Sequence, residues 1–206
     1  MSRGFRHRHT RAENRCSAVL FILLLMLLSS CASTGIRDNV PVQVPVYMTF
    51  TKKFVLLPAG CIENDIQVKQ ATITGSQGSR QLSLRLDARA DRSGIVILLT
   101  DHSGTGRISY TGGYMSADRD FFIKKIRPEY LLADFQFSCY DICSTAEALE
   151  AANLHFTVET VENGEIEIRR IYSYSKCLEE ITIRKDSLTI TNHFHNYTYT
   201  VRYTEE

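Results

Sequence analysis

Apolar and polar residues alternate one by one along many short stretches of this chain, and this pattern constrains the fold most. Successive side chains of a β-strand point to opposite faces, so strict alternation predicts a strand with one buried face. The alternating stretches are residues 81–87, 165–169, 181–184, 188–191 and 197–203. Residues 95–99 are apolar throughout. They predict a strand that is buried on both faces.

Short breaks that contain glycine separate many of the predicted strands. They lie at residues 75–78, 93–94, 102–104, 112–113 and 163–164. Asn163-Gly164 predicts a hairpin with a type I′ turn, because both residues accept a positive φ. About nine to eleven strands with short connections indicate an antiparallel meander, strongly curved or closed into a barrel. We therefore expect a mainly β protein with a small helical insert.

The helical insert is predicted at residues 128–153, where the alternation stops. Residues 144–152 predict a short helix with Ser144 as its N-cap and Glu147 completing a capping box. Before it, Pro128 stands at a suitable helix start. Apolar residues follow at helical spacing, namely Leu131, Leu132 and Phe135. We expect one or two helices that cover the concave face of an antiparallel curved sheet or open half-barrel.

The first thirty residues predict an export signal. Five arginines and two histidines precede an apolar run at residues 18–28, and only Glu13 opposes their charge. The run has 11 residues, whereas a helix that crosses a membrane needs roughly 20. A basic start, a short apolar run and small residues at its end are typical of a cleaved signal peptide.

Leu28-Ser29-Ser30-Cys31 resembles the lipobox of bacterial lipoproteins. In those proteins the cysteine thiol accepts a diacylglycerol, and the cysteine becomes the first residue of the mature chain. An aspartate at the next position usually signals retention in the inner membrane of Gram-negative bacteria, so Ala32 favours the outer membrane. Several acyl chains such as palmitate would anchor the protein stably, since each buried methylene contributes about 0.8 kcal/mol. An ordinary signal peptide followed by a cysteine is the alternative.

These features divide the chain into three expected segments. They are a cleaved signal peptide at 1–30, a lipidated N-terminus and tether at 31–45, and one β-rich periplasmic domain at 46–206. The signal holds five of the 24 Lys and Arg residues and one of the 23 acidic residues. The mature chain is therefore slightly acidic, and it carries no basic stripe that would indicate nucleic-acid binding.

Four cysteines besides Cys31 remain in the expected mature chain: Cys61, Cys139, Cys143 and Cys177. An even number of cysteines in an exported protein indicates disulfides. The sequence leaves three connectivities open, and we favour Cys139–Cys143 together with Cys61–Cys177.

A metal site is disfavoured, because the cysteine pair at 139 and 143 has no second Cys or His pair at the spacing of zinc sites. His193 and His195 are interpreted as marking one face of a strand. We expect no metal and no cofactor beyond the covalent lipid on Cys31.

Arg127-Pro-Glu-Tyr-Leu-Leu-Ala-Asp-Phe-Gln136 resembles the P-x-x-L-L-A-D-x-Q segment of an uncharacterised family of bacterial outer-membrane lipoproteins, a domain of unknown function. The order of parts is also similar: a lipobox, a strand-rich half, this segment, then Arg170 before closing strands. Residues 191–199 resemble that family's terminal x-N-x-x-x-x-Y strand, and the likeness spans roughly residues 50–203.

The resemblance implies both an architecture and a cellular setting. Members of that family often sit in gene clusters for aryl polyenes, beside a LolA-like carrier and a lipid-type exporter. Their architecture looks like the LolA/LolB group, an open half-barrel whose helices cover a greasy concavity.

The leading hypothesis is therefore a lipoprotein that binds or transfers a lipid, acyl or polyene-type ligand, with an envelope carrier or exporter as its protein partner. The candidate ligand-binding residues are Leu131, Leu132, Phe135 and Phe137. Their alternative interpretation is an ordinary core beneath a helix. The alternative function is an envelope scaffold or assembly factor that docks a protein partner.

An exported hydrolase is disfavoured, and we expect no catalytic residue. Ser103 lies in His102-Ser103-Gly104, but the Gly-x-Ser-x-Gly of a nucleophile elbow is missing because residue 101 is Asp. Asp134 is the most motif-like acid. The sequence ties no second carboxylate or histidine to it, so we expect it to hydrogen-bond nearby backbone.

Overall fold

A computed structural model describes residues 44–62, 64–122 and 126–203. The predicted signal peptide, Cys31 and nearly all of the predicted tether lie outside the described residues. Within the described ranges, no helix has the length and apolarity that a bilayer span requires.

Two antiparallel meanders join into one ten-stranded sheet. The first meander comprises β3 (Ile66–Gln77), β4 (Arg80–Asp91), β5 (Gly94–Asp101), β6 (Gly104–Thr111) and β7 (Tyr114–Ala117). The second comprises β8 (His155–Val161), β9 (Ile166–Ser173), β10 (Lys176–Ile183), β11 (Ser187–Asn192) and β12 (Tyr197–Arg202). The last strand, β12, pairs with the first long strand, β3, and so connects the two halves.

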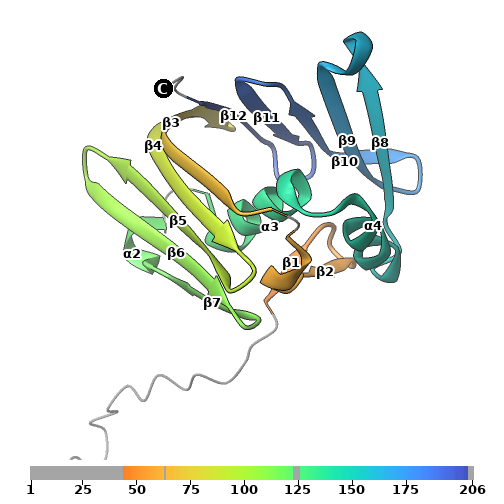
Figure 1. Cartoon of the computed structure of the whole chain (residues 1–206), viewed down its shortest axis with the longest axis horizontal. Helices are drawn as coiled ribbons and strands as arrows, with labels where there is room; N and C mark the ends of the chain where they lie inside the picture. The colour runs from red at the N-terminus through yellow and green to blue at the C-terminus, as the bar shows by residue number, and fades with distance from the viewer. Residues whose placement is uncertain (1–43, 63, 123–125, 204–206) are drawn as a thin grey trace, which may run out of the picture. The chain divides into compact units, whose positions relative to one another are not determined.

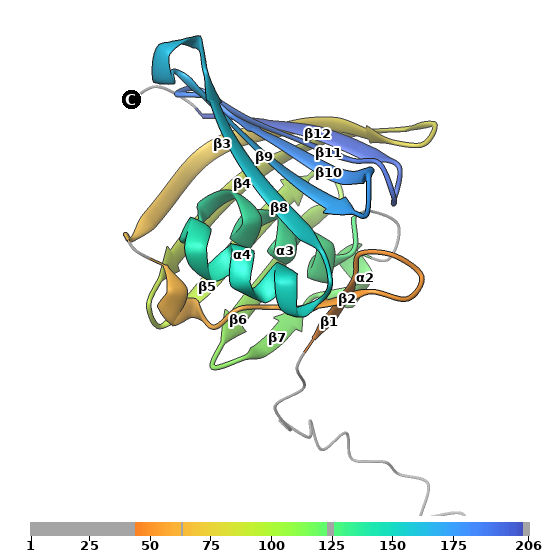
Figure 2. The ribbon, with the colours of Figure 1, turned by 90° about the vertical axis from the view of Figure 1, so that its right-hand side faces the viewer.

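The sheet curves around its helices but does not close (Figures 1 and 2). Its edge strands are β7 and β8, which do not pair with each other. The expected antiparallel curved sheet with an open half-barrel shape is therefore confirmed, and the closed barrel is not formed.

Three helices follow β7: α2 (Arg119–Phe122), α3 (Pro128–Cys139) and α4 (Ile142–Ala151). Pro128 is the first helical residue of α3, as predicted. The predicted N-cap of the next helix is wrong. Asp141 caps α4, and its carboxylate accepts a hydrogen bond of 2.7 Å from the Ser144 amide. A carboxylate at this end also interacts favourably with the helix dipole.

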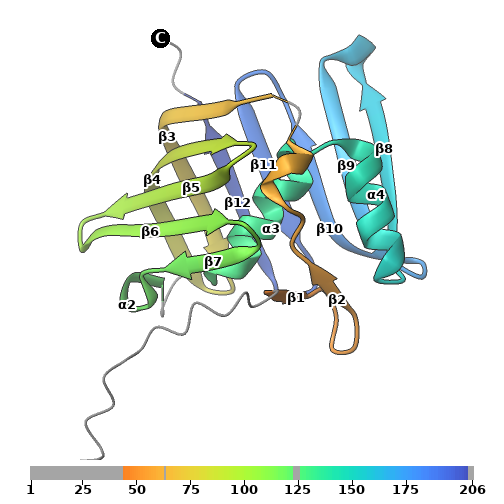
Figure 3. The same cartoon turned by 60° about the horizontal axis from the view of Figure 1, so that its bottom comes forward.

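Helices α3 and α4 lie on the concave face of the sheet, as expected (Figure 2). On the side of α3 and α4 away from the sheet, β1 (Pro45–Tyr47) and β2 (Lys53–Val55) form a separate small hairpin (Figure 3). Strand β1 contacts α3, and β2 contacts α4. A short 3-10 turn, η1 (Ala59–Cys61), follows and contacts β4 and β5. The core thus fills the space between the sheet, the two helices and this hairpin.

The apolar stretch 95–99 forms most of β5, but only one of its faces is buried. Ile95, Ile97 and Leu99 point into the core, whereas Val96 and Leu98 are only half-buried. The prediction of a strand buried on both faces is wrong, because the helices cover the concave face alone.

Two predicted turns differ in detail. Strands β8 and β9 form the expected hairpin, but residues 162–165 separate the paired Val161 and Ile166. The turn contains η2 (Glu162–Gly164), in which Glu162, Asn163 and Gly164 all have positive φ. It is therefore not a two-residue type I′ turn. His193 and His195 lie in the turn between β11 and β12 rather than on a strand.

The predicted break at residues 75–78 is shorter than expected, because Gly75 lies inside β3. Gly75 pairs with Tyr199 of β12, and a Cβ atom at Gly75 would lie 2.6 Å from the Tyr199 Cα. The missing side chain allows this close approach of the two backbones.

Candidate functional site: an apolar cavity beside a buried carboxyl pair

A small apolar cavity lies between α3 and the concave face of the sheet. Helix α3 contributes Leu131, Phe135 and Cys139, which lie four residues apart and therefore on one face of the helix. The sheet contributes Ile66, Val68, Ile73, Leu86, Ala88, Ile97, Leu188, Ile190, Tyr199, Val201 and Tyr203. The cavity has a volume of about 60 Å³. Its lining offers apolar contact almost everywhere, with two tyrosine hydroxyls and one thiol as its polar side-chain atoms.

The structure divides the four predicted ligand-binding residues into two pairs. Leu131 and Phe135 line the cavity, and Phe135 is only half-buried. Leu132 and Phe137 are fully buried outside the cavity lining. The Phe137 ring packs against Phe54 of β2, with 4.7 Å between the ring centroids. Leu132 and Phe137 are therefore core residues.

Asp134 of α3 is buried and accepts hydrogen bonds from two tyrosines of β12. The Tyr197 hydroxyl lies 2.9 Å from both carboxylate oxygens, and the Tyr199 hydroxyl lies 2.9 Å from Oδ2. The expectation that Asp134 bonds nearby backbone is wrong: its partners are distant side chains. These bonds join α3 to the strand that connects the two halves of the sheet.

A second buried carboxyl group, that of Glu179 in β10, lies against Asp134. Its Oε2 accepts a 2.8 Å hydrogen bond from the side-chain Nδ2 of Asn192. Its Oε1 finds no donor among the described residues when both acids are ionised. The two carboxyl groups are close enough to hydrogen-bond each other, which requires a proton on one of them.

The environment of this pair favours protonated acids. Burial raises the pKa of Asp134 to about 7, although hydrogen bonds from Tyr199, Tyr197 and Glu179 oppose the shift. Burial and the neighbouring Asp134 charge raise the pKa of Glu179 well above its usual value. Because the two groups interact, their protons leave in sequence, and ionisation of one carboxyl group opposes ionisation of the other.

Two tyrosines link the carboxyl pair to the cavity and to a second hollow, the aromatic groove. The groove has a volume of about 550 Å³ and is lined by Tyr47, Thr49, Phe50, Gln77, Ile126, Arg127, Tyr130, Phe194, His195 and Tyr197. Tyr199 lines the cavity and Tyr197 lines the groove, and both donate to Asp134. Asp134 therefore holds one side chain of each hollow by a hydrogen bond.

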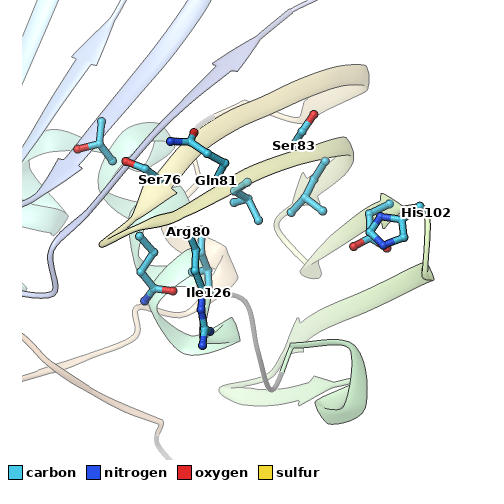
Figure 4. A pocket seen from close by; sticks show the side chains of 11 residues that line it. Ser76, Arg80, Gln81, Ser83, His102 and Ile126 are labelled. Atoms are coloured by element: carbon cyan, nitrogen blue, oxygen red, sulfur yellow. The ribbon is translucent and has the colours of Figure 1, made fainter.

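A third hollow, the polar groove, adjoins the aromatic groove through the shared residues Gln77 and Ile126. Its volume is about 390 Å³. Figure 4 shows its lining, which includes Ser76, Arg80, Gln81, Ser83, His102 and Ile126. In the neighbouring turn, the Ser103 hydroxyl and amide both donate to Asp101, at 2.6 and 2.7 Å, which is the geometry of a turn.

Helix α3 is fastened at several points and is not a loose lid. The side-chain Oε1 of Gln136 accepts a hydrogen bond from the backbone N–H of Leu57 at 2.9 Å, and its Nε2 donates to the Leu57 carbonyl at 2.8 Å. At the end of the helix, Arg169 donates from Nη1 to the carbonyls of Phe137 and Tyr140, at 2.8 and 3.1 Å. A cation at a helix C-terminus is favourable because the last carbonyls carry partial negative charge.

The four cysteines predicted to form disulfides are free thiols in this structure. Cys139 lines the cavity, where burial raises its pKa to about 12, while Cys143 is exposed on α4. Cys61 lies near the Tyr110 and Tyr140 hydroxyls, whereas the Cys177 thiol donates to the Glu179 carbonyl. The structure thus forms neither Cys139–Cys143 nor Cys61–Cys177. Within the described residues, no group of three or more His, Cys, Asp or Glu side chains could hold a metal ion.

Sequence reasoning identified Asp134 but missed its partner Glu179. A β-bulge between Cys177 and Glu179 interrupts the alternation of β10, so Leu178 and Glu179 are both buried. The other partners, Asn192, Tyr197 and Tyr199, lie in residues 191–199, which resemble the terminal strand of the lipoprotein family. No sequence pattern indicated that this segment would contact α3.

One family model, described as Protein of unknown function (DUF3261), matches residues 67–205. The match contains almost the whole ten-stranded sheet and helices α2 to α4, and it begins after the β1–β2 hairpin. A search of curated proteins finds no match to the chain.

Proposed function

The chain belongs to the DUF3261 family, and we propose that it is an outer-membrane lipoprotein that binds an apolar, acyl-type ligand between α3 and the sheet. The observation that carries this proposal is the lining of the cavity, which is apolar except for Cys139, Tyr199 and Tyr203. Binding sites for apolar ligands are typically concave and apolar with a few polar groups. The lipobox-like sequence at Cys31 supplies the proposed lipid anchor.

The size of the cavity sets the conditions for binding. Its volume of about 60 Å³ is far below the roughly 300–1,000 Å³ of typical ligand sites. An acyl chain must therefore displace side chains. The side chain that can move most easily is that of Phe135, because it is only half-buried. Each methylene that leaves water contributes about 0.8 kcal/mol, so a chain of about ten methylenes supplies roughly 8 kcal/mol to offset this displacement.

The architecture supports a binding role. We propose that the open half-barrel with helices on its concave face resembles the LolA/LolB group, whose helices cover a greasy concavity. We propose no catalytic residue and no cofactor apart from the lipid on Cys31. The proposed partners are the membrane, an acyl-type molecule and an envelope carrier or exporter protein.

The test is native mass spectrometry of the full-length protein after expression in a Gram-negative host and gentle extraction from membranes. We expect the lipidated mass of the chain that begins at Cys31, together with a second species that carries a noncovalent apolar molecule. Organic extraction should release that molecule. Recovery of an empty protein in a stable complex with another envelope protein would favour the scaffold function instead.

A further inference from the structure

Exposed apolar side chains gather at the β1–β2 hairpin, residues 45–55. Three of the exposed large hydrophobic residues lie on it, namely Tyr47, Phe50 and Val55. A fourth, Tyr174, lies in the β9–β10 turn and contacts the hairpin through Lys52. Phe50 is 92% exposed and Tyr174 is 90% exposed. Exposed large apolar side chains that gather on one part of a surface indicate an interaction site.

Phe50 lies in a short turn that is closed by hydrogen bonds between its flanking residues. The amides of Met48 and Thr49 donate to the Lys52 carbonyl at 3.0 and 3.3 Å, and the Lys52 amide donates to the Thr49 hydroxyl at 2.9 Å. Phe50 contacts the Phe194 ring edge-on, with centroids 5.1 Å apart. Figure 3 shows this loop extending beyond the sheet and helices.

Charge and aromatic character occur together on this surface. Lys52 Nζ lies 4.4 Å from the centroid of the Tyr174 ring, and Lys53 Nζ lies 4.9 Å from that of the Tyr47 ring. Residues 45–55 contain two lysines and no acidic residue. Tyrosine and lysine favour the membrane–water interface, where the ring or stem is in apolar surroundings and the polar end is in water. Lysines are also attracted to anionic lipid head groups.

The hairpin follows the proposed anchor closely in the chain. Strand β1 begins at Pro45, and the proposed lipidated residue is Cys31. The intervening segment can span at most about 46 Å at roughly 3.3 Å per residue. The β1–β2 hairpin is therefore within reach of the membrane that holds the anchor.

We propose that the β1–β2 hairpin docks on the lipid bilayer, with Phe50 inserted among the head groups and Lys52 and Lys53 at the phosphate level. This inference rests on the proposed lipid anchor at Cys31. Tyr47 and Phe50 also line the aromatic groove, so docking turns one wall of this groove toward the bilayer. An apolar ligand would then reach the protein from the membrane rather than through water.

The chain contains no tryptophan, so a Phe50→Trp variant carries a single reporter at the tip of the hairpin. The full-length, processed protein is reconstituted into vesicles of phosphatidylethanolamine and phosphatidylglycerol, with and without bromine on the acyl chains. We expect a blue-shifted emission and at least a twofold loss of intensity in the brominated vesicles. The control is Glu165→Trp in the β8–β9 turn, which lies at the opposite end of the protein (Figures 1 and 2). Its emission should not change.

Equal quenching of the two variants, or no quenching of either, would overturn the docking proposal. The mass of the same preparations reports separately on the anchor. An unacylated protein contradicts the proposed function, and the emission of the Phe50→Trp variant with excess vesicles still decides the docking. An acylated protein that floats with vesicles while its Phe50→Trp emission stays unquenched preserves the anchor and removes the docking.

Discussion

The buried carboxyl pair predicts that a single substitution, Glu179→Gln, changes how stability depends on pH. Burial raises the pKa of Glu179 well above its usual value of 4.5, and the Asp134 charge adds to this shift. The folded protein therefore holds a proton that the unfolded chain has already released. Below the pKa of the unfolded chain, such a group does not lower the free energy of unfolding. As pH rises from there toward the raised pKa of the folded state, the free energy of unfolding falls.

The magnitude follows from the proton count. Burial raises the pKa of Asp134 to about 7, and burial together with the Asp134 charge raises the pKa of Glu179 well above its usual value. In the pH range where the folded parent holds the Glu179 proton and the unfolded chain has released it, stability falls as pH rises. One proton that only the folded state holds lowers the free energy of unfolding by about 1.4 kcal/mol for each pH unit, so the upper limit from pH 5 to pH 7 is about 3 kcal/mol.

The Glu179→Gln variant lacks this titration but keeps a donor for Asp134, since its amide replaces the protonated acid. Its free energy of unfolding should therefore rise relative to the parent by up to about 3 kcal/mol from pH 5 to pH 7. Urea denaturation of both proteins at the two pH values measures this difference. Glu165→Gln, at an exposed position, is the charge control and should follow the parent. Parallel pH dependence of the Glu179→Gln variant and the parent would refute the shared-proton account.

Three further outcomes follow from the packing of α3 and the cysteines. Arg169→Ala removes both bonds to the last carbonyls of α3, so urea denaturation should show a loss of about 2–3 kcal/mol. Leu132→Ala should lower the free energy of unfolding by about 2–5 kcal/mol. Leu98→Ala, on the half-buried convex face, should lower it by less than about 1 kcal/mol. Equal losses would contradict the assignment of Leu132 to the core. The exposed Cys143 should react with a maleimide in the native protein faster than the half-buried Cys139, and protection of both until reduction would reveal a disulfide between them.

The architecture was predictable because alternation is a local property of the sequence. Leu84, Leu86 and Ala88 alternate along β4 and all point into the core. Helices α3 and α4 also follow from local spacing, whereas the short helix α2 was not predicted. A curved sheet with helices on its concave face was therefore accessible from the sequence alone.

The site was less predictable because its contacts join residues that are far apart in sequence. Tyr197 and Tyr199 are more than sixty residues from Asp134, and the bulge that turns Glu179 inward leaves no compositional mark. Burial on both faces of β5 was a wrong prediction for a related reason, since a run of apolar residues does not specify which sheet face a helix covers. Leu131 and Leu132 are adjacent in sequence, yet only Leu131 reaches the cavity.

The most direct test of the central claim is whether filling the cavity abolishes binding of an apolar molecule. Ala88 lines the cavity from β4 and is buried, so Ala88→Leu should occupy the space that a ligand needs. Titration with N-phenyl-1-naphthylamine, with palmitate as competitor, should give saturable binding to the parent and at least a tenfold weaker affinity for Ala88→Leu. Urea denaturation checks that this variant is folded, and Val96→Leu on the convex face should bind as the parent does. Absence of binding by the parent, or equal affinity for the parent and a folded Ala88→Leu variant, would contradict ligand binding between α3 and the sheet.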